Sequence, residues 1–165
     1  MLVEDALRGA EVAQGFDGPI VDVGSGNGSP GLVLASNLPA REVTLLDSNK
    51  RKAAFLERTA TDFPNVKVAW GRAEEHEGRY GVAVAKALAP PAVALEWLLP
   101  LVLEGGAAVL WLGPSVDLDE LSRVSEQIGG APVEERSGLA VARKTAPTPA
   151  GFPRRPGVAR KRPLA

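Results

Sequence analysis

The stretch that most constrains the fold runs from Ile20 to Gly31 and reads Ile-Val-Asp-Val-Gly-Ser-Gly-Asn-Gly-Ser-Pro-Gly. Its apolar start predicts a buried strand, its glycines predict a tight turn, and the apolar run 32–35 predicts a helix. Glycine reaches positive φ without strain and, lacking a Cβ, lets a ligand lie against the backbone. The free amides at the start of the helix then point at the occupant of the turn. The stretch therefore predicts a strand–turn–helix unit that binds a ligand.

Two ligand classes compete for this turn. Gly26-x-Gly28-x-x-Gly31 fits the dinucleotide fingerprint. Asp22-x-Gly24-x-Gly26-x-Gly28 resembles motif I of class I S-adenosylmethionine methyltransferases. Asp22 directly before the turn would repel a pyrophosphate but suit an ammonium group, which favours the methyltransferase interpretation. A turn without any ligand is the third alternative, although four glycines within eight residues exceed what a plain turn needs.

The bulk composition predicts one globular domain in a chain of 165 residues, 45% of them apolar. No stretch approaches the ~18–20 consecutive apolar residues of a membrane span. The chain lacks cysteine and has a single histidine, His76, so we expect neither disulfides nor a metal site. These features lead us to expect a monomeric cytoplasmic protein with no membrane association.

The charge is divided unevenly along the chain. Residues 1–135 hold all 20 acidic and 11 of the 19 basic residues, a net charge of −9, whereas residues 136–165 carry +8. Residues 148–165 form a basic, proline-rich tail that we expect to lie outside the core. An acidic body with such a tail indicates a polyanionic partner, and proline restraint would let arginines follow phosphates at low ordering cost. A disordered, solubilising tail is the alternative.

The remaining pattern alternates strands and helices. Strands are expected at 20–23, 43–47, 66–70, 80–85 and 107–112, helices at 4–15, 31–38, 50–62, 91–103 and 117–128, and a closing hairpin at 133–136 and 139–144. Ser48 is the expected N-cap of the third helix. The alternation predicts an α/β fold with a mostly parallel sheet covered on both faces. With its C-terminal antiparallel hairpin, this seven-stranded sheet resembles the class I methyltransferase (Rossmann-like) fold. We expect residues 1–147 to form this domain, with a short N-terminal helix.

Polar residues at the carboxyl ends of the strands are the candidates for chemistry, because ligands of open α/β sheets bind there. Asp47, 19 residues past Gly28, could accept hydrogen bonds from both ribose hydroxyls, or act as a partner for the following helix. Lys86 ends the fourth strand and could hold a phosphate, position a base or pair with a neighbouring acid. Trp70, Trp97 and Trp111 lie in strand or helix contexts and are expected to pack there, with a role as base-stacking platforms as the alternative.

Three segments together resemble one family, the small-subunit ribosomal RNA (guanine-N7) methyltransferases known as RsmG or GidB. Residues 22–31 look like the family's D-L/V-G-S-G-A/N-G-F-P-G. Residues 43–47 with Arg51, and Gly-Arg-Ala-Glu-Glu at 71–75, resemble its second and third motifs. The tail at 148–164 looks like its closing T-P-x-x-Y-P-R-R-x-G-x-P-x-K-x-P-L. Ser29, Lys86 and Ala159 depart from the usual phenylalanine, arginine and proline, and the resemblance implies a short form that lacks most of the family's N-terminal helical segment.

The resemblance implies S-adenosylmethionine as cofactor and ribosomal RNA or the small ribosomal subunit as partner. The cofactor-binding residues that it implies are Asp22, Gly24, Ser25, Gly26, Gly28, Asp47, Ser48, Ala73 and Glu74. The RNA-binding residues that it implies are Lys86, which would also be the catalytic residue, Arg154, Arg155, Arg160, Lys161 and Arg162. Guanine N7 carries a free lone pair at neutral pH, so the reaction would require positioning but no general base. A small-molecule methyltransferase and a non-catalytic relative that binds cofactor or RNA are the alternatives.

Overall fold

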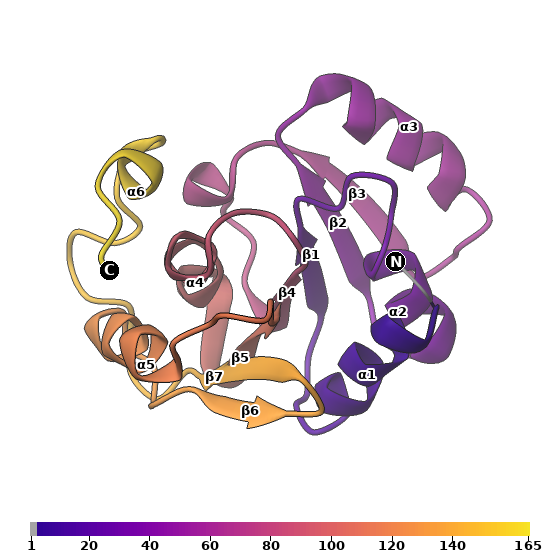
Figure 1. Ribbon diagram of the computed structural model, residues 1–165. Helices are drawn as coiled ribbons and strands as arrows, with labels where there is room; N and C mark the ends of the chain where they lie inside the picture. Colours follow the sequence, from indigo (N-terminus) through magenta and orange to yellow (C-terminus); the bar gives the residue numbers. More distant parts are fainter. Residues whose placement is uncertain (1–2) are drawn as a thin grey trace.

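A seven-stranded sheet in the order β3-β2-β1-β4-β5-β7-β6 forms the centre of the computed structural model, which describes residues 3–165 (Figure 1). The strands from β1 to β5 pair in parallel, and only β7 and β6 run antiparallel to their neighbours. The predicted fold class is confirmed. Between residues 3 and 165, no helix has the length and apolar character needed to cross a membrane.

The elements follow the alternation expected from the sequence. Their bounds are α1 Val3–Ala13, β1 Ile20–Val23, α2 Gly31–Asn37, β2 Val43–Asp47, α3 Lys50–Ala60, β3 Val66–Trp70, η1 Ala73–Glu75, β4 Tyr80–Ala85, α4 Pro91–Leu98, η2 Leu99–Leu101, β5 Val102–Trp111, α5 Leu118–Gln127, β6 Glu134–Arg136, β7 Leu139–Arg143 and α6 Val158–Lys161.

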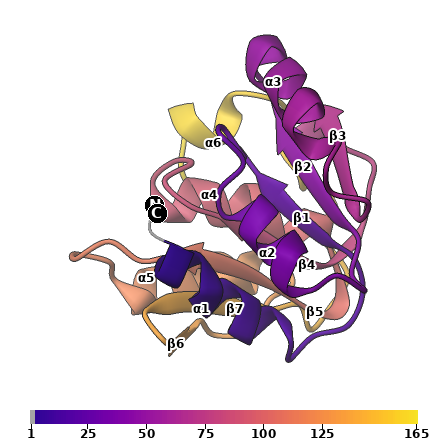
Figure 2. The ribbon, with the colours of Figure 1, turned by 90° about the vertical axis from the view of Figure 1, so that its right-hand side faces the viewer.

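Successive residues of each central strand enter two different apolar clusters, one on each face of the sheet. In β1, Ile20 packs with α1 and α2, whereas Val21 and Val23 pack with α4 and α5. Figures 1 and 2 show α1, α2 and α3 on one side of the sheet and α4 and α5 on the other. The central strands read as continuous apolar runs because both of their faces are covered.

Two sequence expectations about local structure are wrong. The pair Gly105-Gly106 does not precede the fifth strand but lies within β5, and a Cβ on Gly106 would come within 2.2 Å of the Gly81 carbonyl oxygen. Gly106 therefore permits close approach of β4 and β5, whereas a Cβ on Gly105, whose φ is +90°, would meet no atom within 4 Å. The N-cap of α3 is Asn49 and not Ser48, because the Asn49 side chain accepts hydrogen bonds from the first amides of the helix.

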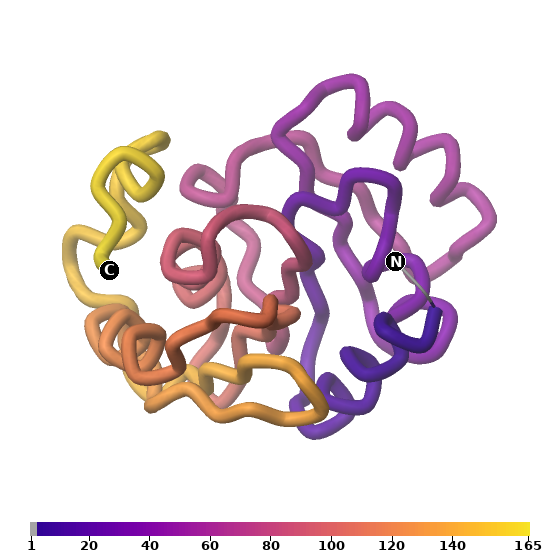
Figure 3. The backbone as a smooth tube through the Cα atoms, viewed as in Figure 1, coloured from indigo at the N-terminus to yellow at the C-terminus, as the bar shows by residue number. Residues whose placement is uncertain are grey.

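The C-terminal segment, defined as residues 148–165, turns back along α4 after β7 (Figure 3). Ala159 is 2% exposed, and Phe152 and Leu164 pack against the cluster that includes α4 and α5. At the start of the segment, the Lys144 ammonium donates a hydrogen bond to the Thr148 hydroxyl at 2.6 Å. The expectation that the whole segment lies outside the core is wrong for these buried and half-buried residues.

An ion pair joins the C-terminal segment to α4. Glu96 is 2% exposed, and its carboxylate accepts hydrogen bonds from Arg154 Nε at 2.8 Å and from Arg154 Nη2. The hydrogen bonds with Glu96 raise the pKa of Arg154 above its ordinary value. A buried carboxylate is strongly unfavourable unless it is paired. The only charged residue of α4 therefore depends on the C-terminal segment for its ion-pair partner.

We expect Arg154→Ala to lower the free energy of unfolding by roughly 3 kcal/mol, because it leaves the Glu96 carboxylate buried and unpaired. Urea denaturation measures the change, with Arg155→Ala at the exposed neighbouring position as the control. The double variant Glu96→Leu with Arg154→Leu removes both charges and should unfold closer to the wild type. Equal stability of Arg154→Ala and Arg155→Ala would contradict this account.

Candidate functional site

The glycine-rich turn between β1 and α2 has the backbone conformation that its sequence predicts. Gly24, Gly26 and Gly28 have φ angles of +72°, +56° and +97°, values that other residues adopt only with strain. Gly31, the first residue of α2, lies so close to the buried Leu45 that a Cβ would come within 2.2 Å of it. The turn therefore brings the start of α2 directly against the sheet.

The Asp22 side chain is buried under the backbone of this turn and does not lie on the side that a ligand would occupy. Its carboxylate Oδ2 accepts a hydrogen bond from the Gly31 amide at 2.9 Å, and the residue is 1% exposed. The other oxygen, Oδ1, is buried and has no hydrogen-bond partner within residues 3–165. Burial raises the pKa of Asp22 from 3.8 to about 7, and the charge of Asp47 adds to this rise, whereas the Gly31 hydrogen bond opposes it.

Asp47, at the end of β2, holds the same turn from the other side. Its Oδ2 accepts from the Gly26 amide at 2.9 Å, and its Oδ1 accepts from the Asn49 amide at 2.8 Å. A carboxylate has about four acceptor positions, so two remain for a ligand's hydroxyl groups. The side chain thus fixes the turn and keeps capacity for the hydrogen bonds that the sequence predicts for it.

A cavity of about 170 Å³ opens at the carboxyl ends of β1, β2 and β3, on the side of the sheet covered by α4. Its lining combines the backbone of glycine residues with apolar surfaces and a few polar groups. The lining residues are Val23, Gly24, Leu46, Ser48, Gly71, Arg72, Ala73, Glu74, Leu88, Trp97, Gly157 and Arg160.

The C-terminal segment supplies one wall of this cavity. The Gly157 amide donates to the Glu74 carboxylate at 3.3 Å, which ties the segment to η1. Arg160 places its guanidinium carbon 5.2 Å from the centroid of the Trp97 ring and donates to the Leu88 carbonyl at 3.3 Å. The sequence predicted RNA binding for Arg160 and gave no sign that this residue lies at the cavity.

The cavity brings together part of the predicted cofactor site. Gly24, Ser48, Ala73 and Glu74 line it directly. Asp22, Ser25, Gly26, Gly28 and Asp47 lie in or behind the turn instead, and the Ser25 hydroxyl donates to the Asp22 carbonyl at 2.8 Å. Of the lining residues not foreseen, Arg72 follows the third strand within a recognised motif, whereas Trp97 carries no local signal because it sits among apolar residues of α4.

The lining of the cavity has the chemical character of a nucleoside site. The apolar surfaces of Leu88 and Trp97 match an aromatic ring, the Ser48 hydroxyl and Glu74 carboxylate match hydroxyl and amino groups, and the glycines allow close approach. No group of three or more histidine, aspartate or glutamate residues within 3–165 is arranged to hold a metal ion.

Lys86 lies at a second depression, separated from the first by the turn after β4. This depression, of about 460 Å³, lies at the carboxyl ends of β4 and β5 and includes Trp111. Lys86 Nζ is 3.9 Å from Asp5 Oδ2 of α1, so the lysine pairs with an acid, one of the alternatives open at the sequence level. Ala87 has a φ of +51°, and the next residue, Leu88, lines the first cavity. The two depressions thus share residues 86–88 as their boundary.

The tryptophans do not all pack in the interior. Trp97 is 8% exposed, and Trp111 is half-buried and donates through Nε1 to the Asp5 carbonyl at 3.0 Å. Trp70 is 62% exposed. The packing expectation is wrong for Trp70, the last residue of the edge strand β3, in which every residue is half-buried or exposed.

Sequence comparisons identify close relatives over most of the chain. Residues 1–141 match the model of the family described as GidB, rRNA small subunit methyltransferase G. The ribosomal RNA small subunit methyltransferase G of Synechococcus elongatus is 36% identical over 183 residues, covering 97% of this chain and 75% of the relative. The protein of the same name from Thermotoga neapolitana is 38% identical over 164 residues, covering 89% and 72%.

Solved structures with a similar fold are S-adenosylmethionine-dependent methyltransferases. A TehB-like enzyme from Corynebacterium glutamicum has a TM-score of 0.60 and 20% identity, covering 86% of each chain. An O-methyltransferase from neocarzinostatin biosynthesis, solved with S-adenosylmethionine, has a TM-score of 0.64 and 20% identity, covering 82% of this chain and 52% of its own. At this identity the likeness establishes the shared fold and does not bear on the methyl acceptor.

The raised pKa of Asp22 predicts a pH-dependent stability. Asp22 favours folding most below its ordinary pKa of 3.8, and this contribution is lost as the pH rises through about 7. The amide of Asp22→Asn does not titrate, so the variant should gain stability relative to the wild type between pH 4 and pH 8. The gain should reach about 4 kcal/mol, since each pKa unit corresponds to about 1.4 kcal/mol. Urea denaturation without ligand at several pH values measures it.

The matched control for this measurement is Asp62→Asn, the same exchange at an exposed position after α3. Its stability should follow the wild type at every pH. If Asp22→Asn also runs parallel to the wild type, the carboxyl group of Asp22 is not destabilised by burial.

Proposed function

The chain belongs to the family of small-subunit ribosomal RNA methyltransferases G, and on that premise we propose that it methylates N7 of a guanosine in this RNA. It is an S-adenosylmethionine-dependent methyltransferase of small-subunit ribosomal RNA. The observation that carries the finer proposal is the family match over residues 1–141, which spans the glycine-rich turn, the second depression and every lining residue of the first cavity except Gly157 and Arg160.

The first cavity is the proposed site of the cofactor. Gly24 gives close backbone approach, Ser48 and Asp47 would accept hydrogen bonds from the ribose hydroxyls, and Ala73 and Glu74 would contact the adenine. Ser25, Gly26 and Gly28 maintain the turn. We assign Asp22 to the amino-acid end of the cofactor through the turn that it supports, because its own carboxylate is directed at the Gly31 amide.

The second depression is the proposed acceptor site. Bound S-adenosylmethionine supplies an electrophilic methyl group, and N7 of guanine carries an unprotonated lone pair at neutral pH. The protein then needs to align the base with the cofactor and exclude water, with no general base. Lys86 would orient the guanosine or its phosphate, and Asp5 holds its ammonium near the depression until RNA arrives.

The C-terminal segment is assigned to both ligands. Arg154 is committed to Glu96, and Arg160 covers Trp97 at the cofactor cavity. Arg155, Lys161 and Arg162 are exposed and are free to contact the RNA backbone. We place the reaction in the cytoplasm, where ribosomal subunits are assembled, and we propose that the enzyme acts as a monomer.

The decisive experiment is transfer of labelled methyl from S-adenosylmethionine to small ribosomal subunits and to naked ribosomal RNA that lack N7-methylguanosine. We expect label at a single N7-methylguanosine in the RNA, identified by nuclease digestion and mass spectrometry. Transfer to another atom would overturn the N7 assignment. Absence of transfer to either substrate, with cofactor binding intact, would overturn the proposed acceptor.

We expect Asp47→Ala to weaken S-adenosylmethionine binding by about 10-fold or more, because the ribose hydroxyls and the Gly26 amide lose their acceptor. Isothermal titration calorimetry measures the affinity. Asp62→Ala is the control because it makes the same exchange at an exposed position, and it should bind like the wild type. An unchanged affinity of Asp47→Ala would remove Asp47 from the cofactor site.

A further inference from the structure

Trp70 presents an aromatic surface that the fold leaves uncovered. The side chain is 62% exposed at the end of the edge strand β3. Its indole Nε1 donates a hydrogen bond to the Ser48 carbonyl at 3.1 Å, and the Lys50 ammonium lies 5.2 Å from the ring centroid. These two contacts hold the ring in one orientation. A large apolar side chain that is both exposed and fixed suits a surface that receives a ligand.

The first turn of α3 beside Trp70 carries charges that disfavour the helix itself. Lys50, Arg51 and Lys52 are consecutive, all three are exposed, and the first turn contains no acidic residue. Cations at a helix N-terminus oppose the helix dipole, which favours acids there. None of these three forms a salt bridge with a carboxylate within residues 3–165. The Lys50 ammonium lies over the Trp70 ring, but no carboxylate among residues 3–165 offsets the three charges, which therefore suit an external anion.

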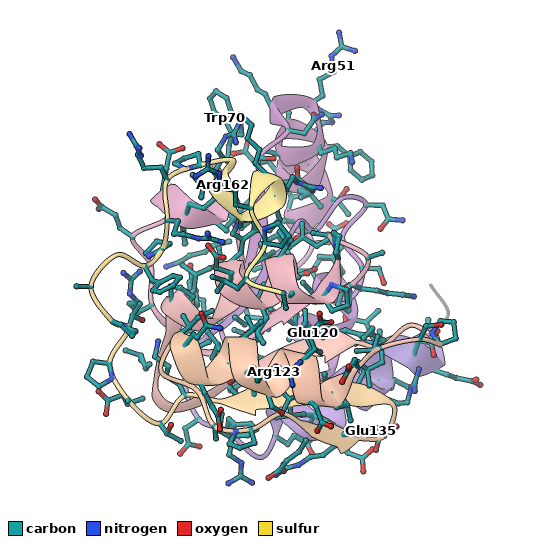
Figure 4. All side chains as sticks on the ribbon, turned by 60° about the vertical axis from the view of Figure 1, so that its left-hand side comes forward. Arg51, Trp70, Glu120, Arg123, Glu135 and Arg162 are labelled. Carbon is teal, nitrogen blue, oxygen red and sulfur yellow. The ribbon has the colours of Figure 1, made fainter. Side chains whose placement is uncertain are left out.

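The Trp70 surface is continuous with the cofactor cavity. Ser48, whose carbonyl holds the indole, lines that cavity together with Arg72 and Arg160. Figure 4 places Arg51, Trp70 and Arg162 at one end of the molecule, whereas Arg123 and the acidic residues labelled with it lie toward the other end. A body whose first 135 residues carry a net charge of −9 therefore gathers exposed cations around an exposed indole.

We propose that Trp70 is a stacking platform for an unpaired nucleobase of the RNA substrate, flanked by Lys50, Arg51, Lys52 and Arg72 as phosphate contacts. The inference rests on the proposed function. Bases of single-stranded RNA stack on aromatic side chains, while neighbouring cations hold the backbone. The Lys50 ammonium that now lies over the ring can pair with the phosphate of the stacked nucleotide.

This base is distinct from the one that is methylated. Trp70 belongs to β3, whereas the second depression lies at β4 and β5, and the cofactor cavity lies between the two. Trp70 and Arg72 line a depression together with exposed Glu75 and Glu77, whose carboxylates would repel phosphates from their part of it. The RNA path is thereby confined to the side where α3 and the C-terminal segment carry their cations. The platform fixes the register of the RNA relative to the methylated nucleotide.

The test compares Trp70→Ala, Trp70→Phe and the wild type for binding of a fluorescein-labelled single-stranded oligoadenylate and of small-subunit RNA, measured by fluorescence anisotropy. We expect Trp70→Ala to weaken binding about 10-fold, the size typical for loss of one base–aromatic stack, and Trp70→Phe to retain most of the affinity. RNA should quench tryptophan emission in the wild type but much less in Trp70→Phe, whose remaining tryptophans are more buried.

Two controls match the tested side chains. Leu103→Ala removes a large apolar side chain that is 49% exposed near the start of β5, and Arg123→Ala removes an exposed cation of α5 for comparison with Arg51→Ala. Both controls should bind RNA like the wild type, whereas Arg51→Ala should bind more weakly and with a shallower salt dependence. Cofactor affinity is measured for every variant by calorimetry.

The outcomes separate this inference from the proposed function. If the wild type methylates RNA and Trp70→Ala binds RNA equally well, the platform is overturned and the proposed function stands. If the wild type neither binds nor methylates RNA, both are overturned. If Trp70→Ala and Trp70→Phe lose cofactor affinity together with RNA affinity, the indole supports Ser48 and does not stack on a base.

Discussion

The glycine-rich turn between β1 and α2 is held by two carboxylates, and the backbone that borders the proposed cofactor cavity depends on them. Asp22 accepts from the first amide of α2, and Asp47 accepts from the Gly26 amide in the middle of the turn. Positive φ angles alone would leave a glycine-rich turn many conformations, because glycine is restricted less than any other residue. The two acceptors select one of them before a ligand arrives, which lowers the ordering cost of binding. Two neighbouring carboxylates repel each other when both are ionised. The raised pKa of Asp22 reduces this repulsion, because the group stays protonated to a higher pH.

The cavity also depends on a segment from the opposite end of the chain. α4 carries a glutamate on an otherwise apolar helix, and the partner of this Glu96 comes from position 154. Once Arg154 is anchored, the following residues bring Gly157 and Arg160 to the cavity wall, where Arg160 lies over Trp97. The wall of the proposed cofactor cavity is therefore complete only when the C-terminal segment is packed against α4.

Sequence reasoning succeeded where local pattern and tertiary structure agree. Alternating strands and helices predicted the fold, and four of the residues expected to bind the cofactor, Gly24, Ser48, Ala73 and Glu74, line one cavity, where their binding role stays a prediction. It failed where the decisive contact is distant in the chain. Nothing near Glu96 indicates a partner 58 residues later, and a proline-rich basic composition does not reveal that Ala159 is buried. The exposure of Trp70 was equally invisible, because an apolar pattern does not tell an edge strand from a central one.

One turn of four residues connects the two proposed binding surfaces. Asp47 holds the glycine-rich turn, and Ser48 lines the cofactor cavity while its carbonyl fixes the Trp70 indole. Asn49 caps α3, and Lys50 lies over the same indole. Each residue contacts a different part of the site, but all four share one short backbone whose geometry is set by the Asp47 and Asn49 hydrogen bonds. Substitutions within this turn must therefore be non-additive, because a change at any position moves the partners of the other three.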